Sequence, residues 1–303
     1  MTWTRERLYM LSAQVQENTG APAQALATDG IEILQWFPGL QSLYGLTLQG
    51  QLYAWGASSA MPLHSDQQGP VSHMQQLPVP APVKTISTGM SHALALNMEG
   101  QLWTWGANGA GQLGTGNLQA QVGPQRLKSH WRWVAIAAGV SHSLALDTHG
   151  QLWGWGSNHQ HQLSAQWSES YILQPQKVAQ PAGLQFVSVH AGLHLSAAVT
   201  EEGDIWVWGI NSLGQLGQGH TQRMKGMQRI QDLPSVRQLS IGHTHMLALD
   251  NTGIVWAWGD NRHGTCQGVQ VNARAQMRPH AVSMPSAFSQ PSPHAAPDTL
   301  ATV

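Results

Sequence analysis

An all-β fold built from repeated four-stranded units is predicted by three features of this 303-residue chain. First, a glycine, ten residues, a second glycine, four residues and a Trp-Gly pair recur five times, with successive copies 50, 50, 53 and 50 residues apart. Second, short apolar alternation follows the first glycine. Third, an aromatic-rich run follows the second glycine. Such a period is typical of arrays whose neighbouring units bury one another. The copies begin at Gly39, Gly89, Gly139, Gly192 and Gly242.

Two strands and the turn between them are assigned within each copy. Ser91–Leu96 and Ser141–Leu146 alternate as half-buried strands do. Gln101–Trp105 follows the second glycine of its copy and is aromatic-rich and of strand length. Gly100, between the two runs, is expected to form the hairpin turn, because glycine adopts positive φ at little cost.

Two further strands are expected upstream of each first glycine. Val134–Ala137 is one apolar run of this kind, directly before Gly139. Upstream again lies a shorter run with a proline, such as Pro124–Leu127, and proline is tolerated best on an edge strand. We assign this run to the unit of the glycine that follows it. Four strands per ~50 residues is the unit of a propeller blade, so the sequence predicts a β-propeller.

The Trp-x-Trp pairs predict how the blades stack. Trp103 and Trp105 share one face of their strand, while Leu102 and Thr104 share the other. Each blade of a propeller is covered on both faces by its neighbours, so both sets are expected to be buried. If Trp103, Trp155 and Trp208 fill the space between blades, each change to alanine should cost ~3–5 kcal/mol. The three residues are thereby predicted to behave alike.

The repeated unit resembles the regulator-of-chromosome-condensation (RCC1-type) repeat. The resemblance rests on Gly-x-x-His-(Ser/Ala)-Leu-Ala-Leu, a turn glycine, and Leu-Trp-x-Trp-Gly-x-Asn-x-x-Gly-Gln-Leu-Gly, seen best over residues 89–114 and covering about residues 35–270. It implies a β-propeller, seven-bladed in the best-known members. Five blades are recognisable here, with six or seven if degenerate units or oligomeric closure contribute. The chain departs from the pattern at Ser42, His161, Ser164 and Leu195.

Three segments are predicted along the chain. Residues 1–21 form an N-terminal extension, residues 22–283 the propeller, and residues 284–303 a disordered tail rich in Pro, Ser and Ala. Closure of the ring requires an outer strand on the first blade. Arg278–Val282 and Pro22–Ala25 are the two candidates for it.

Composition limits the function classes. Charged residues are 10% of the chain and the formal net charge is −1, which argues against a nucleic-acid partner, because that affinity needs clustered Lys and Arg. The single cysteine, Cys266, excludes a disulfide framework within the chain. No run approaches the ~20 apolar residues of a membrane span, and the N-terminal residues lack the apolar core of a signal peptide. We expect a cytoplasmic protein without a membrane partner.

Neither a metal, a cofactor nor a catalytic centre is predicted. Sixteen histidines include three close pairs, but no third ligand completes any of them. The other interpretation is that His92, His142 and His245 each make a structural hydrogen bond within their own blade. Phosphate-cradling loops, nucleophile elbows and paired acidic motifs are missing from the sequence. We therefore expect a protein that is not an enzyme. The three pairs are His159 with His161, His190 with His194, and His243 with His245.

A protein-interaction module that binds an unknown partner protein through its blade loops is the predicted function. The family's founding activity, nucleotide exchange on a small GTPase, is the first alternative, although no room for an inserted wedge appears between the repeats. A stoichiometric enzyme inhibitor, a self-assembling protein and a tryptophan-based photoreceptor are further alternatives. Arg and Trp are enriched at interface hot spots. The candidate partner-binding residues are Trp167, Arg223, Lys225, Arg262 and His263.

Overall fold

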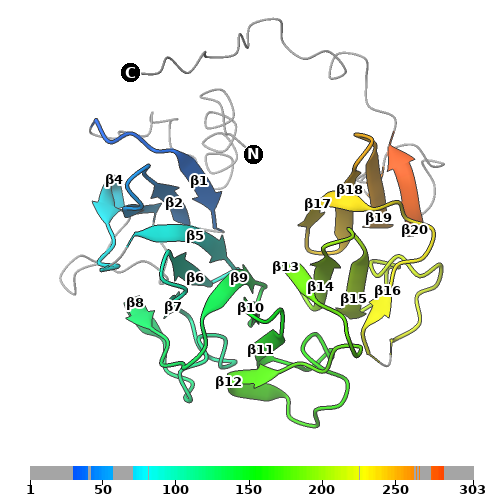
Figure 1. Ribbon diagram of the computed structural model, residues 1–303, viewed down its shortest axis with the longest axis horizontal. Coiled ribbons are helices and arrows are strands. Elements are labelled where there is room, and N and C mark those ends of the chain that lie inside the picture. Colours follow the sequence, from blue (N-terminus) through cyan, green and yellow to red (C-terminus); the bar gives the residue numbers. More distant parts are fainter. Residues whose placement is uncertain are drawn as a thin grey trace, which may run out of the picture.

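The computed structural model describes residues 30–39, 42–56, 71–80, 82–224, 226–262, 264, 266 and 274–282. In this part of the chain every regular element is a β-strand, and the strands form five antiparallel sheets of four strands each. The sheets are the blades of a propeller and follow chain order along an arc, with the first and fifth blades at its two ends (Figure 1). The all-β propeller and its five blades are confirmed. The predicted extension, the predicted tail and Pro22–Ala25 lie outside the described residues.

Each blade is one contiguous stretch of chain. Blade 1 holds β1 (Gln35–Pro38), β2 (Ser42–Leu46), β3 (Leu52–Gly56) and β4 (Val71–Gln76). Blade 2 holds β5 (Val83–Thr88), β6 (His92–Asn97), β7 (Leu102–Gly106) and β8 (Gln121–Arg126). Blade 3 holds β9 (Trp133–Ala138), β10 (His142–Asp147), β11 (Leu152–Ser157) and β12 (Tyr171–Lys177). Blade 4 holds β13 (Phe186–Ala191), β14 (Leu195–Thr200), β15 (Ile205–Gly209) and β16 (Gln228–Arg229). Blade 5 holds β17 (Val236–Ile241), β18 (His245–Asp250), β19 (Val255–Asp260) and β20 (Ala275–Val282).

The assignment of the proline-bearing strands was wrong by one unit. β8 pairs with β7 of the preceding repeat, with Trp103 opposite Arg126, so it ends a blade instead of beginning the next one. Likewise, β20 contains Arg278 to Val282 and pairs with β19 of blade 5, not with blade 1. One loop joins β8 to each of its neighbours in sequence, but residues 127–132 carry the chain to the next blade instead of returning it beside β8. The chain crosses to the next blade only after its fourth strand.

Glycine forms the turn between the second and third strands of every blade, as predicted. The five turn glycines have φ between +72° and +92°, in the left-handed region where a side chain is strained. In blade 3 the side chain of Asp147 also holds this turn, because its Oδ1 accepts the N–H groups of His149 (2.8 Å) and Gln151 (3.1 Å). The five are Gly50, Gly100, Gly150, Gly203 and Gly253.

The second tryptophan of each Trp-x-Trp pair is buried more deeply than the first. Trp105, Trp155 and Trp258 are 0% exposed and Trp208 is 2% exposed, because each points into the interface between two blades. Trp103, the first member of its pair, is only half-buried at the edge of the core. Trp103 is therefore less buried than Trp155 and Trp208, and the prediction that these three residues behave alike was wrong.

Two of the repeated histidines, His92 and His142, hydrogen-bond between blades, which corrects the prediction of a bond within the blade for these two. His92 Nε2 of blade 2 lies 2.9 Å from Ser143 Oγ of blade 3, and His142 Nε2 lies 2.9 Å from Ser196 Oγ of blade 4. The Ser143 hydroxyl donates to the carbonyl of Gln112 (2.8 Å). The Ser143 oxygen can therefore only accept a hydrogen bond from His92. The neutral His92 ring accordingly carries its proton on Nε2. Burial lowers the pKa of His92 to about 4 and that of His142 to about 3.

The departure at Leu195 is explained by the same interface. Leu195 aligns with His142 in its blade, because each stands opposite the glycine of its Trp-Gly pair. The position aligned with Ser143 in blade 5 is Met246, and Leu195 and Met246 are both 0% exposed in one apolar cluster. Histidine and serine are therefore replaced together by two apolar side chains, so that neither polar group is buried alone.

His161 occupies a left-handed position, with φ +57°, where the corresponding residue of blade 2 is Gly111. Its Nδ1 is also buried without a hydrogen-bond partner among the described residues. We expect His161→Gly to raise the free energy of unfolding by ~0.5–1 kcal/mol, because glycine carries no Cβ strain there. The reverse control is Gly111→His, whose Cβ would lie 2.8 Å from Leu173 Cδ2. Urea unfolding measures both changes, and a less stable His161→Gly variant would contradict the expectation.

Candidate partner-binding faces

The two ends of the strands define two faces of the propeller. The loop face carries the connections between the first and second and between the third and fourth strands of each blade, including residues 107–120, 158–170 and 210–227. The hairpin face carries the turns between the second and third strands and the connections from one blade to the next, including residues 127–132 and 178–185. Because the strands are antiparallel, these two sets of connections lie at opposite ends of the sheets.

One asparagine organises the long loop-face connection in each of blades 2, 3 and 4. The Asn108 amide nitrogen donates to the carbonyls of Asn117 (2.8 Å) and Gln119 (3.0 Å), while its oxygen accepts the N–H of Leu113 (2.9 Å). Asn158 and Asn211 hold the next two connections in the same way. These side chains are buried, and their three or more hydrogen bonds fix loops that would otherwise be flexible.

These connections also join neighbouring blades. The Gln112 carbonyl of blade 2 accepts the indole N–H of Trp155 in blade 3 (2.8 Å), and the Gln215 carbonyl of blade 4 accepts that of Trp258 in blade 5 (3.0 Å). Gly116 donates its backbone N–H to the Leu173 carbonyl of the outer strand of blade 3 (2.9 Å). The described connections of blades 2 and 4 are therefore tied to the core of the blade that follows each of them.

Three of the five predicted partner-binding residues lie on described parts of the loop face. Trp167 is half-buried and packs against the core of blades 2 to 4. Arg223 is exposed, and its Nη2 lies 3.4 Å from the His159 carbonyl of the neighbouring blade. Arg262 is exposed but forms an ion pair with Asp260 (2.6 Å), which holds the pKa of that carboxyl at about 2. Lys225 and His263 lie outside the described residues.

Tyr171 is a surface residue that sequence reasoning missed. It begins β12, is 44% exposed and meets the ring of His159 edge-on, with ring centroids 4.8 Å apart. Arg223 of blade 4 donates to the backbone carbonyl of the same His159, so both Arg223 and Tyr171 contact this residue. We call His159, Tyr171 and Arg223 the blade 3–4 surface. The signal that could have identified Tyr171 is an aromatic residue at the first position of an edge strand. Only the proline of that strand, Pro175, entered the sequence prediction.

Neither a metal-binding cluster nor a membrane-spanning helix is found among the described residues. Within the described residues, no group of three or more His, Cys, Asp or Glu side chains is placed to hold a metal ion. No helix in the same residues is long and apolar enough to cross a membrane.

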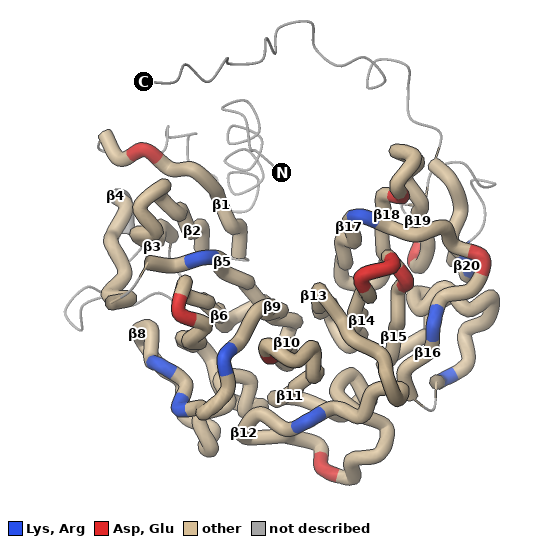
Figure 2. Tube along the Cα trace, viewed as in Figure 1, with Lys and Arg blue, Asp and Glu red and all other residues tan. Residues whose placement is uncertain are grey.

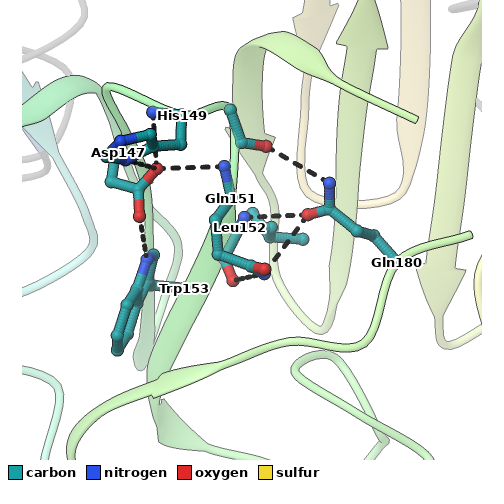
Figure 3. A network of polar contacts seen from close by, with 7 residues as sticks. Asp147, His149, Gln151, Leu152, Trp153 and Gln180 are labelled. Atoms are coloured by element: carbon teal, nitrogen blue, oxygen red, sulfur yellow. Dashed lines mark hydrogen bonds and ion pairs between the residues drawn. The ribbon is translucent and has the colours of Figure 1, made fainter. Parts of the chain in front are cut away.

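The hairpin face carries a second polar arrangement, centred on the buried carboxylate of Asp147. Its Oδ2 accepts the indole N–H of Trp153 (3.0 Å), and Oδ1 accepts the two turn N–H groups (Figure 3). Gln180, from the connection to blade 4, accepts the N–H of Leu152 (2.9 Å) and donates to the carbonyl of Gly150 (3.3 Å). These bonds form the floor of a hollow of about 340 Å³ beside Trp131 and Lys177.

Fold and surfaces together define a class of protein: a β-propeller whose loops are held against the blade core by hydrogen bonds. The family follows from sequence, since residues 7–295 match the RCC1-like domain, and the chain belongs to that family. The resemblance of the repeats to the RCC1-type unit is thereby confirmed.

Relatives resemble this chain over short stretches. Protein RCC2 of Mus musculus is 41% identical over 71 residues, which is 23% of this chain and 14% of that protein. The E3 ubiquitin-protein ligase HERC2 of Homo sapiens is 32% identical over 92 residues, 30% of this chain and 2% of that protein. The chain thus spans a minor part of these relatives.

Solved structures share the fold. Human WBSCR16 superimposes with a TM-score of 0.75 at 21% identity, over 84% of this chain and 68% of that one. Prp20p of Saccharomyces cerevisiae, whose structure was described with its binding to Gsp1p and histones, gives a TM-score of 0.75 at 21% identity, over 86% of this chain and 65% of that one. At these identities the likeness shows the fold alone.

Proposed function

We propose that the protein is an interaction scaffold that binds a partner protein through the loop face, with the blade 3–4 surface as the main contact. The observation that carries this proposal is the bridge from Arg223 of blade 4 to His159 of blade 3, next to the exposed ring of Tyr171. Arginine and tyrosine are the residue types that supply most binding energy at interfaces when they are held in place.

Pre-organisation supports the proposal. The connections that carry His159 and Arg223 are fixed by the buried amides of Asn158 and Asn211. A partner would therefore order few groups on this side of the interface, which lowers the entropic cost of association. Arg262 contributes less in this scheme, because the carboxylate of Asp260 already neutralises its charge.

A small GTPase is the partner class with independent support. The RCC1-type resemblance implies nucleotide exchange on such a protein, and the similar structure of Prp20p was described with its binding to Gsp1p. We place this regulation second to general scaffolding, because the repeats leave no room for an inserted wedge. We further propose that the chain acts in the cytoplasm and is not an enzyme. In this proposal it uses no cofactor and binds neither nucleic acid nor a membrane.

Affinity capture from the native cell lysate, followed by calorimetry with the captured partner, tests the proposal. Arg223→Ala combined with Tyr171→Ala should weaken binding at least ~10-fold, which is about 1.4 kcal/mol. Arg237→Ala combined with Ile254→Ala removes an exposed arginine and an exposed apolar side chain from the hairpin end of blade 5 and should change the affinity less than ~2-fold. Equal losses in both double variants would contradict the proposal.

Nucleotide release from the captured partner then separates the two functions. A GTPase regulator should accelerate release of bound nucleotide, and the Arg223→Ala and Tyr171→Ala variant should lose that acceleration together with binding. A pure scaffold should bind the partner without changing the release rate. Both results are compatible with binding through the loop face. They distinguish a protein that regulates nucleotide release from one that only binds its partner.

A further inference from the structure

The second surface of interest lies on the hairpin face of blades 2 and 3 and is independent of the proposed function. It consists of the connection that carries Trp131 and of the hollows on either side of this residue. The larger hollow, about 340 Å³, is lined by Lys177 and His149 among others, and the smaller, about 130 Å³, by Arg126 and Arg132. Trp131 lines both hollows, and we call this residue with the two hollows beside it the Trp131 site.

Lys177 is held in place by aromatic rings instead of by a carboxylate. Its ammonium nitrogen lies 5.3 Å from the ring centroid of Trp131 and 5.6 Å from that of Trp153, and the two indoles contact each other at 4.8 Å. Such cation–π contacts fix the position of the charge without neutralising it. The ammonium group therefore stays available to a ligand, and less side-chain entropy remains to be lost on binding.

The connection before blade 3 is fixed as well. The Trp131 N–H donates to Ser129 Oγ (2.9 Å), and the Arg132 guanidinium donates to the Glu99 carbonyl of the blade 2 turn. The next residue, Trp133, donates its N–H to the Gly100 carbonyl (2.9 Å). The connection is therefore held against blade 2 immediately before β9 begins, so the basic side chains project from a rigid support.

Charge on this surface is unbalanced, although the chain as a whole is nearly neutral. Lys and Arg positions lie at the end of β8, in the connection from β8 to β9 and at the end of β12 (Figure 2). Three arginines of blades 4 and 5 form ion pairs, but within the described residues the exposed cations of the Trp131 site have no ion-pair partner. The nearby carboxylate of Asp147 is buried and hydrogen-bonded, and that of Glu99 is exposed. The unpaired cations are Arg126, Lys128, Arg132 and Lys177.

We propose that the Trp131 site binds an acidic peptide segment of a partner protein, with carboxylates at Lys177 and Arg132. A carboxylate accepts hydrogen bonds from guanidinium and ammonium groups, and such charge-assisted bonds are stronger than neutral ones. Nucleobase stacking is disfavoured, because the Trp131 ring already contacts Trp153 and the Lys177 ammonium. The scaffold would thereby hold one partner on each face.

Fluorescence anisotropy with a labelled peptide of alternating glutamate and glycine tests the proposal. We expect binding that weakens as salt is raised, because the contacts are ionic and exposed. Lys177→Glu combined with Arg132→Glu should weaken it at least ~10-fold. The matched control, Arg237→Glu combined with Arg274→Glu, makes the same charge change away from both the Trp131 site and the blade 3–4 surface and should weaken binding less than ~2-fold. Thermal unfolding of both double variants checks the fold; if the first unfolds, glutamine replaces glutamate in both.

Four results would overturn the inference. The first is equal binding of a peptide with glutamine in place of glutamate, and the second is equal loss in the two double variants. The third is absence of binding by the acidic peptide. The fourth is tighter binding of oligothymidylate, which would assign the site to nucleic acid. None of these results bears on the loop face, so the inference and the proposed function can fail separately.

Discussion

Trp155→Ala is expected to lower the free energy of unfolding by about 3–5 kcal/mol. The side chain is 0% exposed, and its indole N–H donates to the Gln112 carbonyl of the preceding blade (2.8 Å). Truncation therefore opens a cavity between blades 2 and 3 and leaves a buried carbonyl with one hydrogen bond fewer. Urea unfolding followed by far-ultraviolet circular dichroism measures the loss.

Trp103→Ala is the matched control for that prediction. Trp103 is half-buried, and its indole N–H has no hydrogen-bond partner among the described residues. Its removal should cost roughly 0.5–3 kcal/mol, in the ordinary range for a partly buried side chain. Equal costs for Trp103→Ala and Trp155→Ala would contradict the assignment of the second tryptophan as the residue between the blades.

Acid is expected to destabilise the protein through the two buried interblade histidines. Their folded-state pKa values, about 4 for His92 and about 3 for His142, lie below the unfolded value of 6.5. The unfolded chain therefore binds more protons below pH 6.5, so stability is complete above that pH and falls as the pH drops toward 4 and 3. At pH 5 each histidine should cost about 2 kcal/mol, which urea unfolding at a series of pH values measures.

Blade 5 suggests the control for the acid effect. His142→Leu combined with Ser196→Met copies the natural pair Leu195 and Met246 into the interface between blades 3 and 4. The Trp208 indole N–H, buried without a partner, could then donate to the Gln162 carbonyl that Ser196 now occupies, as Trp258 does to Gln215. We expect this variant to lose the contribution of His142, about 2 kcal/mol of the destabilisation between pH 6.5 and 5. An unchanged pH dependence would show that other groups cause the acid effect.

The repeat spacing was sufficient to predict the blades. Glycine turns and Trp-x-Trp strands are local features, and both can be recognised from the residue types alone. The pairing of the outer strand was not predictable in this way. A proline in Pro124–Leu127 marks an edge strand, but it does not say whether the preceding or the following hairpin supplies the partner. That choice depends on the geometry of the connection at residues 127–132, which carries no turn signature of its own.

The interblade histidine bond shows a second limit. His92 was recognised as structural, but its partner, Ser143, lies 51 residues away and one position after the histidine of the next repeat. This contact can be predicted only when it is known which residues of one blade lie opposite which residues of the next. Arg223 was selected for its chemistry, and the structure adds its position beside His159. Tyr171 and the Trp131 site were missed because exposure, not residue type, distinguishes them.

Hydrogen–deuterium exchange of the complex with the captured partner is the most direct test of the claim that the loop face of blades 3 and 4 binds a protein. Partner binding should slow exchange in residues 158–171 and 210–224 and leave the hairpin turn at residues 147–151 unchanged. Protection confined to the hairpin face, or spread equally over both faces, would contradict the account.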